Sequence, residues 1–323
     1  MKTPQFFQLH HEDNGQIRTE LLKGLQATQA YTSPKYLYDA LGSKLFEAIC
    51  ELPEYYPTRT ETAIFAEHGE SMASHIPQGA ALIDLGAGNC QKAANLFKQL
   101  QPSRYVAVDI SVDFLKDAMT RLQYQHPDLD MIGVGMDFAE SLALPLAALA
   151  GIAPRVFFYP GSSIGNFTPD EALAFLKRIH AACPASQQGQ GGLLIGVDLV
   201  KGKTELEAAY DDALGVTAAF NRNMLLHINR LIGGDFNIQD WSHVALYDEQ
   251  LSRIEMHLQA KQDVALHWMD GGRVFAKGER IHTENSYKWT VQSFSALLQN
   301  AGFAKPMVWT DADAKFAVMW AAA

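Results

Sequence analysis

The sequence lacks the features that mark secreted, membrane-spanning and metal-binding proteins. Its three cysteines, Cys50, Cys90 and Cys183, are widely spaced and odd in number, which favours reduced thiols in a cytoplasm over a disulfide framework. The N-terminal residues 1–16 have no apolar signal-peptide core, and no run of about 18 apolar residues occurs, so we expect no transmembrane segment. The eleven histidines show no HExxH-like spacing, and we therefore expect no metal site.

Positive charge is also scarce in this chain. The 26 lysines and arginines are outnumbered by 36 aspartates and glutamates, which gives a formal net charge of −10 and a pI near 5.5. Phosphate backbones and anionic membranes attract basic surfaces, so we expect neither nucleic acid nor a membrane as a partner. The apolar fraction of 48% over 323 residues is typical of a globular protein with room for one large α/β domain and a smaller lobe.

Strand-like and helix-like segments alternate between residues 61 and 200. The strand-like segments are "AALIDLGAG", "RYVAVDI", "DMIGVGMDF", "RVFFYPGSSIGNF" and "GGLLIGVDLV". Such apolar runs without strict alternation are typical of strands that are covered on both faces. Repeated β-α units of this kind predict a parallel, doubly wound sheet.

Polar residues mark the expected starts of the helices. The clearest is a capping box at Thr168, with Pro169 in the first turn and Glu171 three residues after the cap. We expect three further caps on the same reasoning: Ser111, the Thr58–Glu61 pair and the Thr204–Glu207 pair.

Residues 201–285 interrupt the alternation with a long helical stretch, broken near Gly215, and with several strand-like segments. The helix "TVQSFSALLQNAGF" and the two strands "PMVWT" and "KFAVMW" then complete the pattern. The predicted fold is therefore α/β, with the Rossmann-like, seven-stranded doubly wound sheet of class I S-adenosylmethionine-dependent methyltransferases. We assign residues 61–200 and 286–323 to this cofactor domain, and residues 1–60 and 201–285 to a smaller substrate-binding lobe.

The turn "DLGAGNCQK" after the first strand of the sheet predicts the cofactor site. Gly86 and Gly88 allow a ligand to approach the backbone closely, but Gln91 replaces the third glycine of a dinucleotide fingerprint. This difference favours S-adenosylmethionine, which carries no phosphates, and leaves NAD as the weaker alternative. Asp109 ends the second strand, where a carboxylate can bind both ribose hydroxyls. Asp137 and Phe138 end the third strand, where they can contact the adenine.

Five stretches together resemble one family, the histidine-specific N-methyltransferases of the ergothioneine pathway and the related methyltransferase module of ovothiol synthases. They are "YDALGSKLFEAICELPEYYPTRTE", "GSSIGNFTPDE", "DLVKGKTELEAAYDDALGVTAAFNRN", "SRIEMHL" and "HTENSYKW". The resemblance covers roughly residues 30 to 323. It implies cofactor contacts at Gly86, Lys92, Asp109, Asp137 and Phe138.

The resemblance also implies a site for a free amino acid. Asn166 and Tyr210 would hold its carboxylate, while Glu284 and Ser286 would bind the imidazole ring beside Met256. Tyr38 and Tyr56 would come from the N-terminal segment that closes the site. These residue types suit the ligand, because a carboxylate accepts an imidazole N–H, and amide and phenol groups can donate to a carboxylate.

We expect in-line transfer of the sulfonium methyl group to a substrate nitrogen, with no residue assigned as general base. The residues of these motifs resemble the ovothiol module more closely, which favours ring-nitrogen methylation of 5-thiohistidine in ovothiol biosynthesis. The alternative is methylation of the α-amino group of L-histidine, which gives hercynine. A non-catalytic S-adenosylmethionine sensor and an enzyme acting on protein histidines are further alternatives. We expect a cytoplasmic monomer.

Overall fold

The computed structural model describes residues 2–9, 14–110, 112–149, 154–183, 190–269 and 271–323. Contacts within the chain divide it into two compact units. The first comprises residues 1–11, 57–200 and 289–323, and the second comprises residues 12–56 and 201–288. Within the described ranges, no helix has both the length and the apolar character that a membrane span requires.

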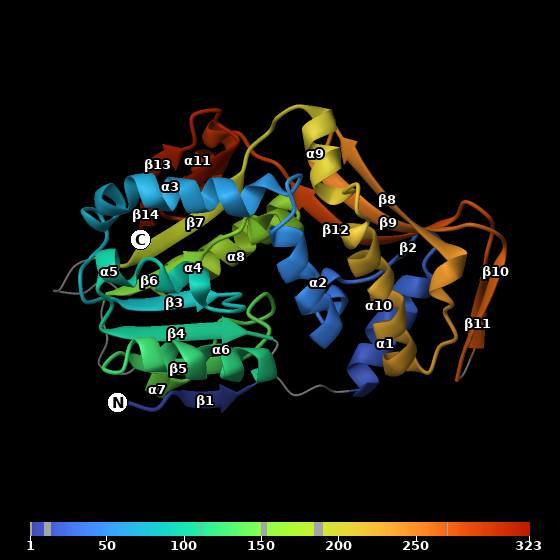
Figure 1. Ribbon diagram of the computed structural model, residues 1–323, viewed down its shortest axis with the longest axis horizontal. Helices are drawn as coiled ribbons and strands as arrows, with labels where there is room; N and C mark the ends of the chain where they lie inside the picture. The colour runs from blue at the N-terminus through green and yellow to red at the C-terminus, as the bar shows by residue number, and fades with distance from the viewer. Residues whose placement is uncertain (1, 10–13, 111, 150–153, 184–189, 270) are drawn as a thin grey trace. The chain divides into compact units, whose positions relative to one another are not determined.

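An eight-stranded sheet forms the centre of the first unit (Figure 1). In spatial order its strands are β1 (Gln5–Gln8), β5 (Asp130–Gly135), β4 (Arg104–Asp109), β3 (Ala81–Leu85), β6 (Arg155–Tyr159), β7 (Gly192–Asp198), β14 (Phe316–Ala322) and β13 (Met307–Thr310). The strands from β1 to β7 pair in parallel, and β14 runs antiparallel to both of its neighbours. This is the predicted class I methyltransferase layout, in which the carboxyl ends of β3, β4 and β5 meet at one edge of the sheet.

The sheet differs from the prediction in its first strand. The sequence pattern predicts that residues 1–60 belong to the substrate-binding lobe, but Gln5–Gln8 pair with Ile132–Gly135 and add an eighth strand at the sheet edge. The segment "QFFQ" is too short and too polar at its ends to be identified as a strand by pattern alone. Its position depends on hydrogen bonds to β5, which lies far away in the sequence.

Helices connect the strands of this unit. They are α3 (Tyr56–Ala73), α4 (Gln91–Ala94), α5 (Phe97–Leu100), α6 (Val112–Gln125), α7 (Leu146–Leu149), the 3-10 helix η2 (Ser163–Asn166), α8 (Pro169–Ala181) and α11 (Val291–Asn300). The capping box of α8 is confirmed, because Thr168 and Glu171 each accept the other's backbone N–H. The predicted cap Ser111 lies outside the described residues. The predicted Thr58 cap is wrong, because α3 begins two residues earlier, at Tyr56.

A four-stranded sheet in the order β2-β12-β9-β8 forms the centre of the second unit. Its strands are β2 (Ala30–Tyr31), β12 (Arg280–Tyr287), β9 (Arg253–Ala260) and β8 (Trp241–Asp248), and a separate hairpin consists of β10 (Val264–Trp268) and β11 (Gly271–Phe275). The helices are α1 (Asn14–Gln26), η1 (Pro34–Leu37), α2 (Ala40–Cys50), α9 (Lys203–Tyr210), α10 (Val216–Ile232) and η3 (Ile238–Asp240).

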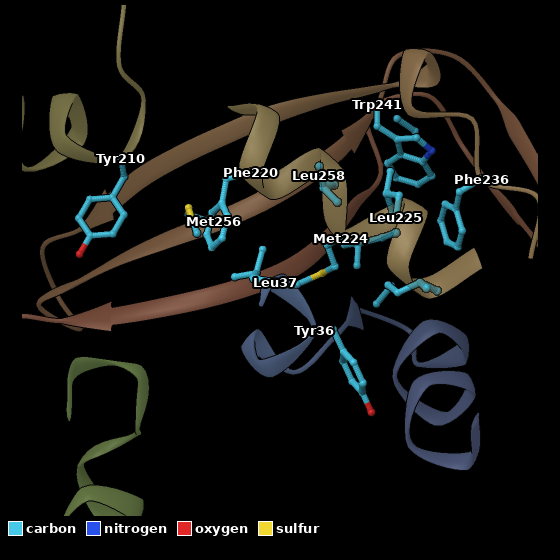
Figure 2. Packing of buried hydrophobic residues seen from close by; sticks show 14 of the residues in the cluster. Tyr36, Leu37, Tyr210, Phe220, Met224, Leu225, Phe236, Trp241, Met256 and Leu258 are labelled. Atoms are coloured by element: carbon cyan, nitrogen blue, oxygen red, sulfur yellow. The ribbon is translucent and has the colours of Figure 1, made fainter. Parts of the chain in front are cut away.

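Helix α10 packs one face of this sheet and buries the core of the second unit. Figure 2 shows Phe220, Met224 and Leu225 of α10 against Met256 and Leu258 of β9. The predicted break at Gly215 is confirmed, because Gly215 adopts a positive φ of 74° and caps α10. The predicted Thr204 cap is wrong, since Gly202 precedes α9 and Glu207 instead accepts the backbone N–H of Tyr247.

Candidate active site

The glycine turn after β3 is stabilised by the end of β4. Gly86 and Gly88 have φ values of +72° and +51°, a left-handed conformation that side chains rarely adopt. The backbone N–H groups of Gly86 and Ala87 donate to the Val108 carbonyl, and that of Gly88 donates to Asp109 Oδ2 at 2.9 Å. The structure therefore brings together Gly86, Gly88 and Asp109, as the sequence predicted for a cofactor turn.

Phe138 lies beside this turn. A Cβ atom placed on Gly86 would meet the Phe138 ring at 3.7 Å, so a larger side chain would fill the space between the turn and the ring. The ring also packs edge-on against Tyr159, with centroids 5.8 Å apart. Asp137 accepts the backbone N–H of Ala139 at 3.0 Å, which fixes the backbone at the end of β5. These residues fit an adenine-binding wall with an acceptor and an aromatic face.

Lys92 binds a carboxylate that the sequence did not identify as part of the site. Its ammonium donates to Glu61 Oε2 at 2.7 Å, and Glu61 Oε1 accepts the backbone N–H of Gly161 at 2.7 Å. The Glu61 side chain is only 1% exposed. Glu61, predicted as a helix cap, therefore links α3, α4 and the loop after β6. Its capping-box spacing gave no signal of this role, because both partners are distant in sequence.

Asn166 ends the short helix η2, which follows the same loop. Ser162 holds that loop in an unusual conformation: its φ is 56°, and its hydroxyl accepts the backbone N–H of Asp198 at 2.8 Å. A non-glycine residue with positive φ is strained and is common at functional sites. Asn166 is half-buried, and within the first unit it belongs to the same loop region as Gly161, which Glu61 anchors.

A β-bulge in β12 sets the direction of the predicted ring-binding residues. His282 pairs with His257 and Glu284 pairs with Met256, so Thr283 is an additional residue in the ladder. Paired residues of antiparallel strands share a face, which places Glu284 on the core face with Met256. Ser286 follows two residues later on the same face. The side chains of Glu284 and Ser286 are 7% and 4% exposed, so they are not a solvated strand end.

Ser286 belongs to a hydrogen-bonded triangle with Tyr210 and Lys288. The two hydroxyl oxygens are 2.7 Å apart, and the Lys288 ammonium donates to Tyr210 at 3.0 Å and to Ser286 at 2.8 Å. The ammonium also lies 4.8 Å from the centroid of the Tyr210 ring. Figure 2 shows the Tyr210 hydroxyl pointing away from the labelled apolar residues. Lys288 is buried, and the sequence reasoning did not include it, although its alternation with Glu284 and Ser286 was visible.

An aromatic side chain of the second unit packs against this triangle, and the predicted Tyr38 and Tyr56 have contacts of their own. Tyr55 packs edge-on against Tyr210, with centroids 6.2 Å apart, and burial holds the pKa of Tyr55 well above its usual range. Tyr38 packs edge-on against Phe46 and Phe220. Tyr56 accepts a hydrogen bond from Lys201 at 2.7 Å. The structure thus brings together four of the predicted substrate residues, which are Tyr210, Met256, Glu284 and Ser286. Tyr38 and Tyr56 lie in the same unit, where they contact other residues.

The parallel sheet, its glycine turn and the polar strand ends define a class I methyltransferase domain. A model of the histidine-specific, S-adenosylmethionine-dependent methyltransferases matches residues 17–323. The chain therefore belongs to this family, and the predicted family resemblance is confirmed. It is an S-adenosylmethionine-dependent methyltransferase, and Asp109, Asp137 and Phe138 provide groups that fit this cofactor.

Two mycobacterial relatives match almost the whole chain. Histidine N-alpha-methyltransferase of Mycolicibacterium smegmatis is 36% identical over 302 residues, which cover 91% of this chain and 91% of that protein. The protein of the same description from Mycobacterium tuberculosis is 36% identical over 320 residues, covering 96% and 97%. Ergothioneine biosynthesis protein 1 of Neurospora crassa is 31% identical over 283 residues, covering 85% of this chain and 31% of that longer protein.

Proposed function

We propose that this enzyme methylates the α-amino nitrogen of free L-histidine. The observation that carries the proposal is the buried pair Glu284 and Ser286, which the bulge at Thr283 places on the core face of β12. Ser286 is hydrogen-bonded there to Tyr210. Two relatives at 36% identity are described as acting on this nitrogen, which favours the α-amino group over the ring. The proposal replaces the prediction of ring methylation, which was based on the residues of the motifs.

Each predicted binding residue has a chemical role in this proposal. Glu284 accepts one imidazole N–H in a charge-assisted hydrogen bond, and Ser286 binds the second ring nitrogen, with Met256 beside the ring. Tyr210 donates to the substrate carboxylate, and Asn166 is the second proposed donor. Tyr38 and Tyr56 are proposed contacts from the N-terminal segment. A substrate without an imidazole N–H would leave the buried Glu284 carboxylate without that bond, which disfavours its binding.

We assign the cofactor to the first unit. Asp109 binds the ribose, Asp137 and Phe138 bind the adenine, and Gly86, Gly88 and Lys92 complete the site. S-adenosylmethionine supplies the electrophilic methyl group of the sulfonium. The protein contributes orientation and exclusion of water, and the accepting nitrogen must be neutral. Tyr55 stays a neutral phenol because burial raises its pKa, so it is not a ready proton acceptor.

Ring-nitrogen methylation of 5-thiohistidine remains the second candidate. It rests on the stretches "DLGAGN", "YPGSSIGNFTP" and "HTENSYKW", whose residues resemble those of the ovothiol module. A non-catalytic sensor of S-adenosylmethionine would bind the cofactor and methylate nothing. We further propose that the enzyme is a cytoplasmic monomer.

The test is turnover with each amino acid separately, followed by mass spectrometry of the products. L-Histidine with S-adenosylmethionine should give mono-, di- and trimethylated products, and fragmentation should place every methyl group on the α-amino nitrogen. A single ring methyl on 5-thiohistidine, with histidine left unchanged, would establish the second candidate instead. Methylation of a histidine-containing peptide, or of no substrate, would contradict the proposal.

The variant Glu284→Gln tests the proposed role of Glu284 in ring binding. It keeps the size of the side chain but removes the charged acceptor, so we expect KM for histidine to rise about tenfold, which corresponds to one charge-assisted hydrogen bond. The exposed residue Glu249 provides a control, because Glu249→Gln makes the same chemical change at an exposed position. An unchanged KM in Glu284→Gln would exclude Glu284 from ring binding.

A further inference from the structure

The hydrogen-bonded triangle of Lys288, Tyr210 and Ser286 has only two hydroxyl protons, which limits what it can donate to a substrate. A lysine ammonium donates only, so both hydroxyl oxygens must accept from it. Each hydroxyl carries one proton, and the 2.7 Å contact between them uses one of the two. The triangle can therefore offer a substrate at most one O–H donor.

Two arrangements of these protons exclude each other. If Ser286 donates to Tyr210, the Tyr210 proton is directed outward, and Ser286 retains a lone pair that can accept. If Tyr210 donates to Ser286, the Ser286 proton is directed outward, and Tyr210 can only accept. A carboxylate requires a donor, so a carboxylate bound at Tyr210 selects the first arrangement.

We propose that Lys288 is a positioning residue that couples the two hydroxyls, so that Tyr210 donates to the substrate carboxylate while Ser286 accepts an N–H of the substrate ring. The inference rests on the proposed function. Glu284 accepts the other ring N–H, so the pocket binds histidine with a proton on both ring nitrogens. A ring nitrogen that donates its proton has no lone pair for a methyl group. The α-amino nitrogen is then the acceptor that remains.

The charges of the second unit are consistent with this arrangement. Glu284 on β12 faces the same side as Ser286 and balances the charge of a protonated ring. Lys288, two residues beyond Ser286, lies close enough to support the substrate carboxylate through Tyr210. Tyr55 lies near Tyr210, with Cys50, Tyr38 and Glu284 around Tyr55. His243 also faces Tyr210, since its Nε2 lies 2.8 Å from the Tyr210 carbonyl oxygen, and burial lowers its pKa. Tyr55 stays neutral because burial raises its pKa.

The direct test uses the unmodified enzyme. L-Histidine labelled with ¹⁵N in the ring is bound in the presence of S-adenosylhomocysteine at pH 8, where the free ring, with a pKa of about 6.5, is mostly neutral. The ¹⁵N chemical shifts report whether each ring nitrogen carries a proton. We expect both nitrogens of the bound ring to be protonated. One unprotonated ring nitrogen in the complex would overturn the inference.

A variant of Lys288 tests whether this residue causes the binding of a doubly protonated ring. 2-Fluoro-L-histidine has nearly the shape of histidine, but fluorine lowers the basicity of its ring so that the ring stays neutral. The enzyme should bind histidine at least about tenfold more tightly than this analogue, as one charge-assisted hydrogen bond predicts. In Lys288→Met the hydroxyl protons can rearrange, and the preference should fall below about threefold. Lys277→Met, at an exposed lysine of the same unit, should keep the full preference.

The outcomes separate the inference from the proposed function. If Lys288→Met weakens both ligands by the same factor, Lys288 has a structural role only, and the inference fails while histidine methylation stands. If the enzyme neither binds nor methylates histidine, the proposed function fails, and the inference fails with it. If Lys288→Met does not fold, the ¹⁵N measurement on the unmodified enzyme still decides the protonation of the ring.

Discussion

Glu61 has a role that only its surroundings explain. Its carboxylate lies between the Lys92 ammonium and the backbone N–H of Gly161, and it accepts a hydrogen bond from each at 2.7 Å. Gly196 leaves the space for it, since a Cβ there would lie 2.0 Å from Glu61 Oε1. These two hydrogen bonds, one of them from a charged ammonium, hold the buried carboxylate in place. It fixes the position of a lysine that the family resemblance assigns to the cofactor.

Asp109 is the residue for which cofactor binding gives the clearest prediction. Asp109→Ala removes both the proposed ribose acceptor and the hydrogen bond from Gly88 that holds the glycine turn. We expect affinity for S-adenosylhomocysteine to fall by about 30-fold or more, as expected for loss of a charged hydrogen-bond partner. Calorimetric titration measures this change. Asp117→Ala, at an exposed aspartate, removes the same charge and should leave the affinity unchanged. Retained binding in Asp109→Ala would refute the ribose assignment.

In strand β12 one additional residue changes which side chains lie on the core face. Ahead of the bulge, Ile281 lies on the core face and His282 on the opposite face. Thr283 shifts the alternation by one residue, so that Glu284 and Ser286, instead of Asn285, lie on the core face beside Met256. Its hydroxyl donates to the Met256 carbonyl at 3.0 Å, which stabilises the bulge.

Two single-residue deletions in β12 should therefore have opposite effects. Deletion of Thr283 leaves Glu284 opposite Met256 in a regular ladder, so we expect histidine affinity to stay within about threefold. Deletion of Asn285 places Glu284 and Ser286 on opposite faces, and histidine binding should be lost. Titration of histidine and, separately, of S-adenosylhomocysteine measures both effects, because cofactor binding by the first unit should persist in each variant. Equal histidine affinity in the two variants would contradict the assigned faces.

Two buried titratable groups influence the stability of the whole molecule in opposite directions. Burial raises the pKa of Asp84 on β3 to about 7, although Tyr105 donates to its carboxyl at 2.7 Å. Burial lowers the pKa of His257 on β9 to about 4, and the nearby His282 adds to this effect. From about pH 4 to pH 7 the folded state binds more protons at Asp84 than the unfolded state, so this residue lowers stability as pH rises. From about pH 4 to pH 6.5 the unfolded state binds more protons at His257, so that residue raises stability as pH rises.

The pH dependence of unfolding in two variants separates these contributions. Relative to the unmodified protein, Asp84→Asn should gain unfolding free energy as pH rises from 4 to 7, by at most about 1.4 kcal/mol per pH unit. His257→Gln should gain it as pH falls from 6.5 to 4, with the same upper limit. Denaturant titrations at several pH values measure both slopes. A pH-independent difference for either variant would show that its residue titrates equally in the folded and unfolded states.

Local pattern in the sequence determined much of this protein. Apolar runs, the Thr168 capping box and the break at Gly215 depend on neighbouring residues, and the glycine turn with Asp109 depends on strand ends that meet in any parallel sheet. Only the tertiary structure decided the strand β1, the role of Glu61, the bulge at Thr283 and the contacts of Lys288. The physical reason is the same for each. Their hydrogen-bond partners or their register come from strands and loops elsewhere in the fold, and no local pattern encodes which partner a buried polar group will meet.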